Sequence, residues 1–527
     1  MNRDQPLRLL FSTQSIGLRV FWSLHKALQE EGGIEAAGFF VTNRPEYARF
    51  NDANPDFAAS AADVITEWEL LDQAHRLPAP DLEYIAAWEK EIADPTLWNA
   101  LIIDRRLNFH LRAQFVQSYK PAYSHEDLLR LLQVSLQAID AHFDRVRPHA
   151  VMGLNAVTLY DYLYYLVARR RGIPVMQLKL TRVRNYVSLY TDPFDLSPHI
   201  RETFERMRRG RDLTGDETAA LADAQALLSE IREKRLVYEG AIKRPNEVRK
   251  AARRPGLPAR LAALAERLVR DRRNRDRHYP APLRYAYETK VLKPLRRRLA
   301  TRLFDIPDAG AFAEQNAGRY ALYPLNTEPE VALLAFGRPY RNQIESVRNI
   351  AASLPVGWKL VVKEHPNSYG YRSAAYYGKL RAIPNVVLAG PTLDTDKLML
   401  GAGLVAVVFG TIGLEALIKG KPVVVLCNTP YGVFPRSMVR FLDRSWGMAA
   451  EIRDLLENHK HDDREVVAFL AAHMTSSIRL NLFTDLLGKG GRQTMDDGLS
   501  REDQYAELAR YTRRRIAEER ARLGVEA

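Results

Sequence analysis

Short β-rich runs alternate with helical segments between residues 331 and 426, at a spacing of about 20 to 30 residues per unit. The β-rich runs lie at residues 331–336, 359–365, 385–390, 404–410 and 421–426. The helical segments between them lie at residues 342–354, 376–382, 394–400 and 412–419. Strands that alternate with helices predict a parallel sheet covered by helices on both faces, as in a doubly wound α/β domain.

A second region of the same kind covers residues 7–195. Its pattern predicts strands at residues 8–11, 36–41, 149–153 and 173–180, and helices at residues 17–29, 60–115, 125–146 and 159–171. We therefore predict an α/β protein with two Rossmann-like domains, because 527 residues exceed what one hydrophobic core usually supports. The predicted parts are an N-terminal domain (1–195), a helical basic insert or linker (196–315), a C-terminal domain (316–460) and C-terminal helices (461–527). Ligands of such a pair bind in the cleft at the carboxyl ends of the sheets.

The positive charge of the chain is concentrated in one stretch. Residues 232–302 contain 23 Lys and Arg against 7 Asp and Glu, a balance of +16, whereas the whole chain carries +13. Such a patch fits the phosphates of a nucleic acid, anionic lipid headgroups or an acidic glycan, or it is a solvated helical face. Nucleic acid is the least favoured of these, because aromatic residues do not alternate with the basic ones as in a stacking platform.

Cys427 is the only cysteine, which excludes an internal disulfide framework and argues against a cysteine-based zinc site. A chain without disulfides fits a reducing compartment, so we expect a cytoplasmic location. No run reaches the roughly 18 to 20 consecutive apolar residues that a membrane-spanning helix needs.

Lys363, Glu364, His365 and Pro366 follow a strongly β-forming run of the C-terminal region. Pro366 prevents further regular pairing, so the run ends here, on the loop where a doubly wound sheet binds ligands. Lys363 offers a point charge to a phosphate, and His365 offers a hydrogen bond or a proton to a phosphoryl oxygen. The alternative is a strand end stabilised by a salt bridge, with a histidine that serves only the structure.

The segment Gly410-Thr411-Ile412-Gly413-Leu414-Glu415 joins a β-rich run directly to a helix. Thr411 suits the start of that helix, whose first N–H groups point outward with the positive end of the helix dipole. This arrangement predicts an anion site of the kind that binds pyrophosphates. Glu415, about one turn into the helix, is either a ligand for ribose hydroxyls or a carboxylate that interacts with the helix dipole.

Five segments occur together in a recognisable order. They read PLNTEPE (324–330), NQIESVRNIAASLP (342–355), LVVKEHP (360–366), PNVVL (384–388) and GTIGLEALIKGKPVVVL (410–426). Over roughly residues 320–430 the chain resembles the capsule polysaccharide biosynthesis family, which includes the Kdo transferases of capsule export systems. The resemblance implies the two-domain glycosyltransferase architecture called GT-B, a nucleotide sugar bound mainly by the C-terminal domain, no metal and no cofactor.

Site residues follow from the resemblance only where the motifs match. Lys363 and His365 correspond to contacts with the donor phosphate, Gly410 and Thr411 to the phosphate-binding turn, and Glu415 to the carboxylate at the nucleoside. The same loops add further expected donor-binding residues, which are Asn326, Glu364 and Pro366. Related transferases often have a Ser-Ser pair where this chain has Gly410-Thr411, which leaves open whether the donor is CMP-linked, as in CMP-Kdo.

A glycosyltransferase of this kind needs a carboxylate that activates the acceptor or attacks the donor. Asp161 is the best-placed candidate of the N-terminal region, because it follows the predicted strand at residues 149–153; the alternative is a surface helix residue. On the same side of the cleft the sequence places residues suited to holding hydroxyls or an anionic acceptor. These are Asn155, Lys179, Arg182 and Arg184.

We therefore expect a glycosyltransferase that moves a sugar from a nucleotide-activated donor to a polysaccharide or lipid-linked glycan acceptor. Three alternatives stay open: a CDP-polyol phosphotransferase, a nucleotide-sugar epimerase and a non-catalytic adaptor of the polysaccharide machinery. We also expect residues 232–302 to hold the protein against the anionic inner face of the cytoplasmic membrane, the alternative being a solvated linker.

Overall fold

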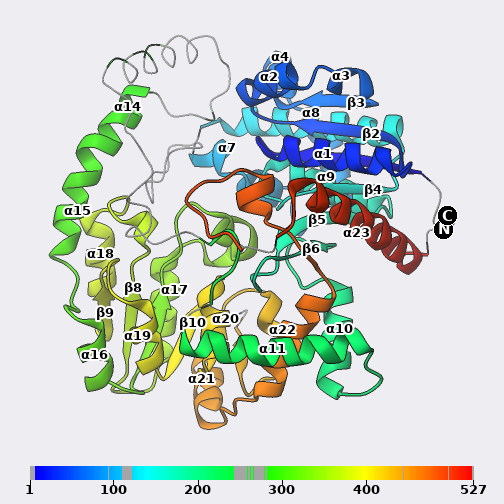
Figure 1. The fold of residues 1–527 in the computed structure, drawn as a ribbon. Coiled ribbons are helices and arrows are strands. Elements are labelled where there is room, and N and C mark those ends of the chain that lie inside the picture. Colours follow the sequence, from blue (N-terminus) through cyan, green and yellow to red (C-terminus); the bar gives the residue numbers. More distant parts are fainter. Residues whose placement is uncertain are drawn as a thin grey trace.

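The computed structural model of the chain describes residues 6–92, 94–109, 122–234, 236–241, 282–442, 444, 446–495 and 498–524, and the single residues at 258, 262, 265 and 278. Two α/β units lie side by side (Figure 1), each built on its own sheet. Most of residues 242–281, the middle of the predicted basic insert, lie outside the described residues.

The C-terminal sheet is parallel, with the strand order β12-β11-β10-β7-β8-β9. Its strands are β7 (Tyr320–Pro324), β8 (Lys359–Lys363), β9 (Val386–Ala389), β10 (Leu404–Val407), β11 (Val423–Val425) and β12 (Val439–Phe441). Valine dominates the central strands because both faces are buried under helices, which leaves no polar face in the sequence. Pro324 pairs with Lys363, so the loops that follow β7 and β8 start next to each other.

Helices cover both faces of this sheet. They are α16 (Ala309–Gln315), α17 (Gln343–Ser353), α18 (Ala374–Arg381), α19 (Thr395–Gly401), α20 (Thr411–Ile418) and α21 (Met448–Glu457). Outside them, α14 (Pro282–Tyr287), the π-helical turn η1 (Glu288–Leu292) and α15 (Lys293–Thr301) form one continuous helix at the edge of the unit.

The N-terminal sheet has the order β13-β6-β5-β4-β1-β2-β3. Its strands are β1 (Leu7–Thr13), β2 (Ile34–Val41), β3 (Asp63–Thr66), β4 (Ala150–Gly153), β5 (Val175–Leu180), β6 (Tyr186–Tyr190) and β13 (Ile478–Arg479). The first five strands pair in parallel, and β6 and β13 are antiparallel additions at one edge. Its larger helices are α1 (Gly17–Glu30), α4 (Glu67–Arg76), α5 (Leu82–Ile92), α8 (His125–Val146) and α9 (Leu159–Arg170).

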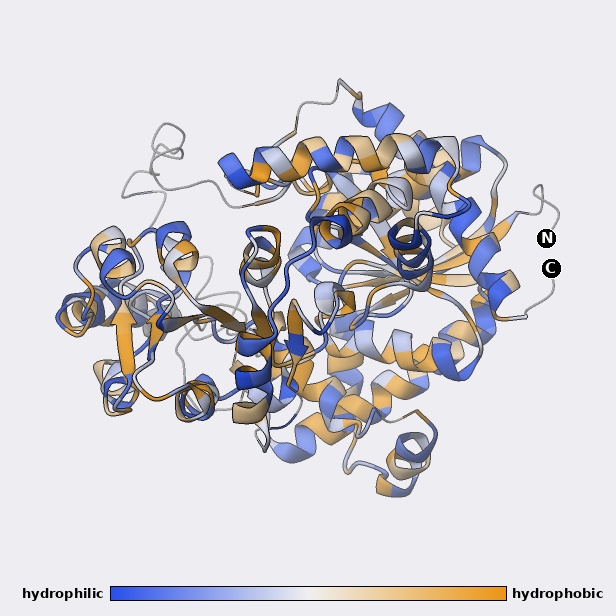
Figure 2. Ribbon diagram, turned by 90° about the horizontal axis from the view of Figure 1, so that it is seen from below, coloured by the Kyte–Doolittle hydropathy of each residue, from blue (hydrophilic) through white to orange (hydrophobic). Residues whose placement is uncertain are grey.

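The chain returns to the N-terminal unit after completing the C-terminal sheet. Strand β13 pairs with β6, and α23 (Arg501–Arg522) packs against α1, so the partner of the C-terminal helix is the first helix of the chain. Between the units, α10 (Pro198–Arg209) and α11 (Gly215–Glu233) pack on α22 (Asp463–Thr475). Figure 2 shows hydrophobic colouring on the strands and on helix faces that turn toward them.

The predicted fold class is confirmed, because both regions form α/β units on mostly parallel sheets. Two local predictions are wrong. Residues 332–336 form the π-helical turn η2 (Ala332–Phe336) instead of a strand, and the described residues of the range 60–115 are divided among β3 and several short helices. The run at 331–336 misled the prediction because it is buried against α6 (Trp98–Ile103) of the other unit, and a short run that is apolar all round fits either element.

Within the described ranges, no helix has both the length and the apolar content that crossing a membrane requires.

We expect Glu239 to anchor the returning segment, which is the part of the chain between Ile478 and Met495 that follows α22. Its fully buried carboxylate accepts hydrogen bonds from the backbone N–H groups of Phe483 and Thr484, both at 2.9 Å. Hydrogen bonds to a charged group contribute about 1.5 to 3 kcal/mol each, so Glu239→Ala should lower the melting temperature by several degrees. Glu239→Gln keeps a carbonyl oxygen for these donors and should recover most of the loss. Equal melting temperatures for all three proteins would contradict this role.

Candidate functional site

A cavity of about 560 Å³ lies between the two units, at the carboxyl ends of the central strands of both sheets. Three parts of the chain supply its polar lining. The N-terminal unit contributes Gln14, Asn155, Lys179 and Arg182; the C-terminal unit contributes Asn326, Thr327, Glu330, His365 and Thr411; the returning segment contributes Lys489 and Arg492. This is where paired doubly wound sheets bind ligands, so we take the cavity as the candidate active site.

Helix α20 begins at the cavity wall. Gly410 precedes it with φ +154°, a backbone conformation that side chains disfavour, and among the described residues this N-cap makes no side-chain hydrogen bond to the first turn. Thr411 and Ile412, the first two helical residues, line the cavity. Tyr431 fixes the turn, because its hydroxyl donates to the carbonyl oxygen of Gly410 at 2.8 Å. The uncapped N–H groups and the helix dipole therefore favour a negatively charged ligand here.

His365 lies at the end of β8 and also lines the cavity. Its Nδ1 accepts a hydrogen bond from the backbone N–H of Asn367 at 3.2 Å, so in the neutral ring the proton is on Nε2. Burial lowers the pKa of His365 to about 4, and the charges of Arg372 and Lys363 act in the same direction. Near neutral pH the unliganded protein thus holds an uncharged imidazole whose Nε2–H donates a hydrogen bond.

The buried side chain of Arg372 holds the loops around His365 in place. Its guanidinium is 0% exposed and forms an ion pair with Glu364, which is 1% exposed. Glu364 also accepts hydrogen bonds from the hydroxyl of Tyr377 at 2.6 Å and from the backbone N–H of His365 at 2.7 Å. Burial opposes the charged guanidinium, yet Glu364 keeps the pKa of Arg372 above its ordinary value. Glu364 thus has structural partners and lies outside the cavity lining.

The same arginine reaches the loop after β7. Arg372 donates to the carbonyl oxygen of Asn326 at 2.5 Å, and its guanidinium lies 3.7 Å from the carboxylate of Glu328. The side chain of Asn326 donates to the carbonyl oxygen of Phe409 at 2.9 Å, which joins this loop to the turn before α20. Three loops that follow β7, β8 and β10 are therefore connected by hydrogen bonds.

Glu330 ends the β7 loop and was missed by the sequence analysis. Its carboxylate lines the cavity and makes no hydrogen bond or ion pair with any residue that the structure describes. Burial raises the pKa of Glu330, whereas the charges of Arg105 and Arg182 oppose that shift. A carboxylate with these properties suits proton transfer. The only sequence signal was its position at the end of PLNTEPE, in a loop next to an apolar run.

The N-terminal wall carries basic side chains, together with Asp195, which pairs with Arg201. Arg182 lines the cavity and holds the left-handed backbone conformation, with φ +67°, that is uncommon outside glycine. Burial lowers the pKa of Lys179 to about 7, against the opposing charge of Asp192. Asn155 lines the cavity as well, whereas Arg184 lies outside the lining with its guanidinium 3.6 Å from Glu230.

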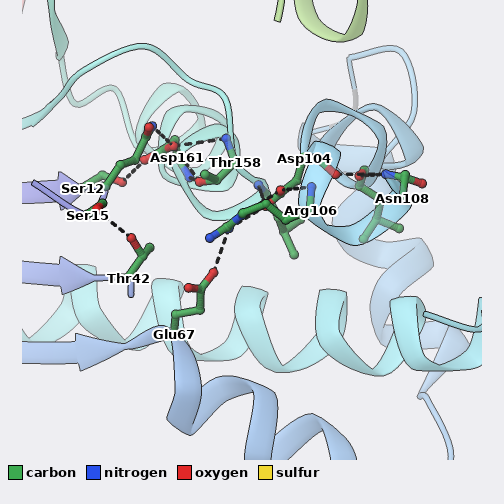
Figure 3. A network of polar contacts seen from close by, with 12 residues as sticks. Ser12, Ser15, Thr42, Glu67, Asp104, Arg106, Asn108, Thr158 and Asp161 are labelled. Atoms are coloured by element: carbon green, nitrogen blue, oxygen red, sulfur yellow. Dashed lines mark hydrogen bonds and ion pairs between the residues drawn. The ribbon is translucent and has the colours of Figure 1, made fainter. Parts of the chain in front are cut away.

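Asp161 is a buried member of a polar network instead of a cavity residue (Figure 3). Its carboxylate accepts from the hydroxyls of Ser12 and Thr158, both at 2.6 Å, and from the side chain of Gln14. With Thr158 it forms a capping box at the start of α9. Burial raises the pKa of Asp161 to about 6, although these hydrogen bonds oppose the shift. The catalytic role expected for Asp161 stays a prediction.

Three other expected donor-site residues lie near the cavity without lining it. The ammonium of Lys363 donates to the carbonyl oxygens of Glu364 and Pro391, at 3.0 and 3.1 Å. Pro366 begins the 3₁₀ turn Pro366–Ser368, and Glu415 is buried inside α20. Their expected ligand contacts remain predictions.

No group of three or more His, Cys, Asp or Glu side chains suited to a metal ion occurs within the described residues. The expected independence of metal stays a prediction.

Replacing Arg372 with methionine should destabilise the C-terminal unit strongly. The change leaves the carboxylates of Glu364 and Glu328 buried without their cation, which typically costs about 3 to 5 kcal/mol and corresponds to a fall of roughly 10 °C in melting temperature. Arg381→Met is the matched control, because Arg381 pairs with Asp305 at 3.1 Å while about half exposed. That control should change stability by at most about 1 kcal/mol. Similar melting temperatures for the two variants would contradict the account.

Residues 252–440 match the family described as "Capsule polysaccharide biosynthesis protein". No curated protein matches the chain.

Three similar solved structures share 10–12% identity with the chain. A KpsC beta-Kdo 2,7 transferase from Thermosulfurimonas dismutans is 12% identical, covers 63% of this chain and 79% of its own, and has a TM-score of 0.32. A UDP-GlcNAc 2-epimerase from Neisseria meningitidis bound to UDP-GlcNAc is 11% identical over 90% and 99%, with a TM-score of 0.23. Staphylococcus aureus MnaA with UDP is 10% identical over 98% and 97%, with a TM-score of 0.26.

Structural similarities with TM-scores this low carry no argument about the chemistry of this protein. The family match does not depend on them. It contains the KEHP loop and the start of α20, the two motifs on which the resemblance depends most. Residues 252–440 thus match the family that the motifs of the sequence predicted.

Proposed function

We propose that this protein is a glycosyltransferase that moves a sugar from a nucleotide-activated donor to a polysaccharide or lipid-linked glycan acceptor. The observation that carries the proposal is the arrangement of the cavity. An uncapped helix start and the imidazole of His365 line it on one side, and Glu330 lines it without a partner among the described residues. The family match to capsule polysaccharide biosynthesis supports the same reading.

In this proposal the donor phosphate binds at the first turn of α20. The backbone N–H groups of Thr411 and Ile412 donate to the phosphoryl oxygens, and the Nε2–H of His365 donates a further hydrogen bond. These fixed donors stabilise the negative charge that grows on the leaving nucleotide as its bond to the sugar breaks. Because the imidazole is neutral, we assign His365 a hydrogen-bonding role and no longer the delivery of a proton.

The acceptor occupies the N-terminal wall, where Arg182, Lys489 and Arg492 favour a negatively charged glycan. Lys179, whose pKa is lowered to about 7 by burial, is only partly charged near neutral pH. Glu330 takes the proton of the acceptor hydroxyl. The hydroxyl oxygen forms the new bond to the anomeric carbon, and the bond from that carbon to the phosphate oxygen breaks. The nucleotide leaves with the electron pair of that bond. Burial of Glu330 raises its pKa, which makes the carboxylate a stronger base.

A panel of CMP-, UDP-, GDP- and CDP-linked compounds tests the proposal directly. A true donor at 100 times its Kd should stabilise the protein by about 2.7 kcal/mol in a thermal shift experiment. Incubation of that donor with capsule oligosaccharide should then yield a glycosylated product, including in the presence of EDTA. Transfer of a polyol phosphate would show that the protein is a phosphotransferase instead. A change in the configuration of a free UDP-sugar without any acceptor would show that it is an epimerase.

His365→Ala should lower kcat by a factor of about 10² to 10³, which is typical for the loss of one donor to a developing negative charge. His365→Gln retains an N–H donor near the same place and should recover part of the activity. Steady-state kinetics on folded variants measures both effects. Turnover close to that of the unmodified protein in His365→Ala would remove this residue from the mechanism.

Glu330→Gln should lower kcat by a factor of about 10² to 10⁴ while donor affinity and melting temperature stay unchanged, because only the proton acceptor is lost. Asp161→Asn is the comparison. It removes a charge that three side chains stabilise, so it should lower the melting temperature and leave kcat within a few fold. The reverse pattern, with turnover lost only in Asp161→Asn, would make Asp161 the base.

A further inference from the structure

The outermost helix of the C-terminal unit carries an apolar stripe on its solvent side. This helix runs continuously through α14, η1 and α15 along the edge of the unit, next to α18 (Figure 1). The stripe recurs at every fourth residue and consists of Tyr287, Val291, Leu295 and Leu299, which are 54%, 52%, 51% and 41% exposed. Surface helices normally turn their apolar residues toward the core. A contiguous stripe that faces solvent indicates an interaction outside the unit.

Basic side chains accompany the stripe. Lys290, Arg298 and Arg302 each follow a stripe residue by three positions, and all three are exposed. None of the three forms an ion pair with another described residue, so their charges are free to meet an external partner. Residues 282–302 as a whole contain seven Lys and Arg against one Glu.

The inner face of the helix is fixed, so the helix cannot turn the stripe inward without breaking several contacts. Arg297 donates from Nε to the carbonyl oxygen of Tyr369 at 3.1 Å, and the Tyr369 hydroxyl donates back to the Arg297 carbonyl oxygen at 3.0 Å. The ammonium of Lys293 lies 3.6 Å from the centre of the Tyr371 ring. Between these tyrosines, Gly370 lies so close to the helix that a Cβ would come within 2.7 Å of the Arg297 side chain.

We propose that the helix at residues 282–301 is an interfacial membrane anchor. Its apolar stripe enters the boundary between headgroups and acyl chains, and the adjacent lysine and arginines bind anionic headgroups. The combination of an apolar stripe with unpaired basic side chains beside it is the pattern of helices that lie in the plane of a membrane surface. An anionic bilayer is the partner whose charge complements this helix, and attraction to it adds about 1 kcal/mol per basic residue near the surface.

Membrane binding needs no sugar donor, so its test is independent of the proposed transfer reaction. The full chain is sedimented with phosphatidylcholine vesicles, alone or with about a quarter phosphatidylglycerol, at low and at high salt. We expect binding only to the anionic vesicles, with an affinity that falls as salt rises and screens the basic side chains. Failure to bind the anionic vesicles at low salt would overturn the proposal.

Two double variants separate the two contributions. Val291→Gln with Leu295→Gln should weaken vesicle binding at least about tenfold, because two apolar side chains no longer leave water. Arg298→Gln with Arg302→Gln should weaken it about 10- to 30-fold and reduce its dependence on salt. Val356→Gln with Leu400→Gln is the matched control, since these residues are also a valine and a leucine and are 105% and 53% exposed. The control should bind like the unmodified protein.

Insertion of the stripe is followed with a probe at a single site. Cys427 is the only cysteine and is buried, so Leu295→Cys provides one exposed thiol for an environment-sensitive fluorophore. We expect a blue shift on addition of anionic vesicles, and none when the probe is placed at Val356→Cys. An unshifted probe at position 295 would overturn the proposal. A molecular mass in solution that changes in the Val291→Gln with Leu295→Gln variant would also overturn it, because the stripe would then join two copies of the chain.

Discussion

The C-terminal half of the cavity depends on one buried ion pair, formed by Arg372 and Glu364. The pair is shielded from water, and Tyr377, Asn326 and the backbone of His365 make further hydrogen bonds with the two side chains. A buried pair of this kind contributes little net stability by itself, but removal of either partner is severe. The loops that present Asn326, Glu330 and His365 share this one rigid support, so the side chains that line the cavity from these loops keep fixed relative positions.

The two units contribute different chemistry to the cavity. The C-terminal unit supplies backbone N–H groups at the start of α20, a neutral imidazole and a carboxylate, which suit a phosphate leaving group and an acceptor hydroxyl. The opposite wall supplies basic side chains, two from the N-terminal unit and two from the segment that returns after α22. Because the buried carboxylate of Glu239 fixes this segment, this wall of the cavity depends on a contact between parts of the chain more than 240 residues apart.

Local patterns in the sequence were sufficient for the alternating α/β units and for the motif loops, because buried parallel strands and helix starts have distinct signatures. These signatures were sufficient to locate four residues that line the cavity, which are Asn326, His365, Gly410 and Thr411. The rest depends on contacts between distant residues. Glu330 gains its environment only when the two units meet, and the apolar run after it was mistaken for a strand because its burial comes from α6. Asp161 was expected to be a catalytic carboxylate or a surface helix residue, yet it is buried and accepts a hydrogen bond from Ser12 of β1, far away in the sequence.

A structure of the protein with the nucleotide-linked compound that raises its melting temperature most would test the central claim directly. The account predicts that phosphate oxygens lie about 2.7 to 3.1 Å from the backbone nitrogens at the start of α20 and from Nε2 of His365. It also predicts that the anomeric carbon faces the carboxylate of Glu330. A nucleotide bound elsewhere, or bound in the cavity with its phosphates against the N-terminal wall and away from α20, would contradict it.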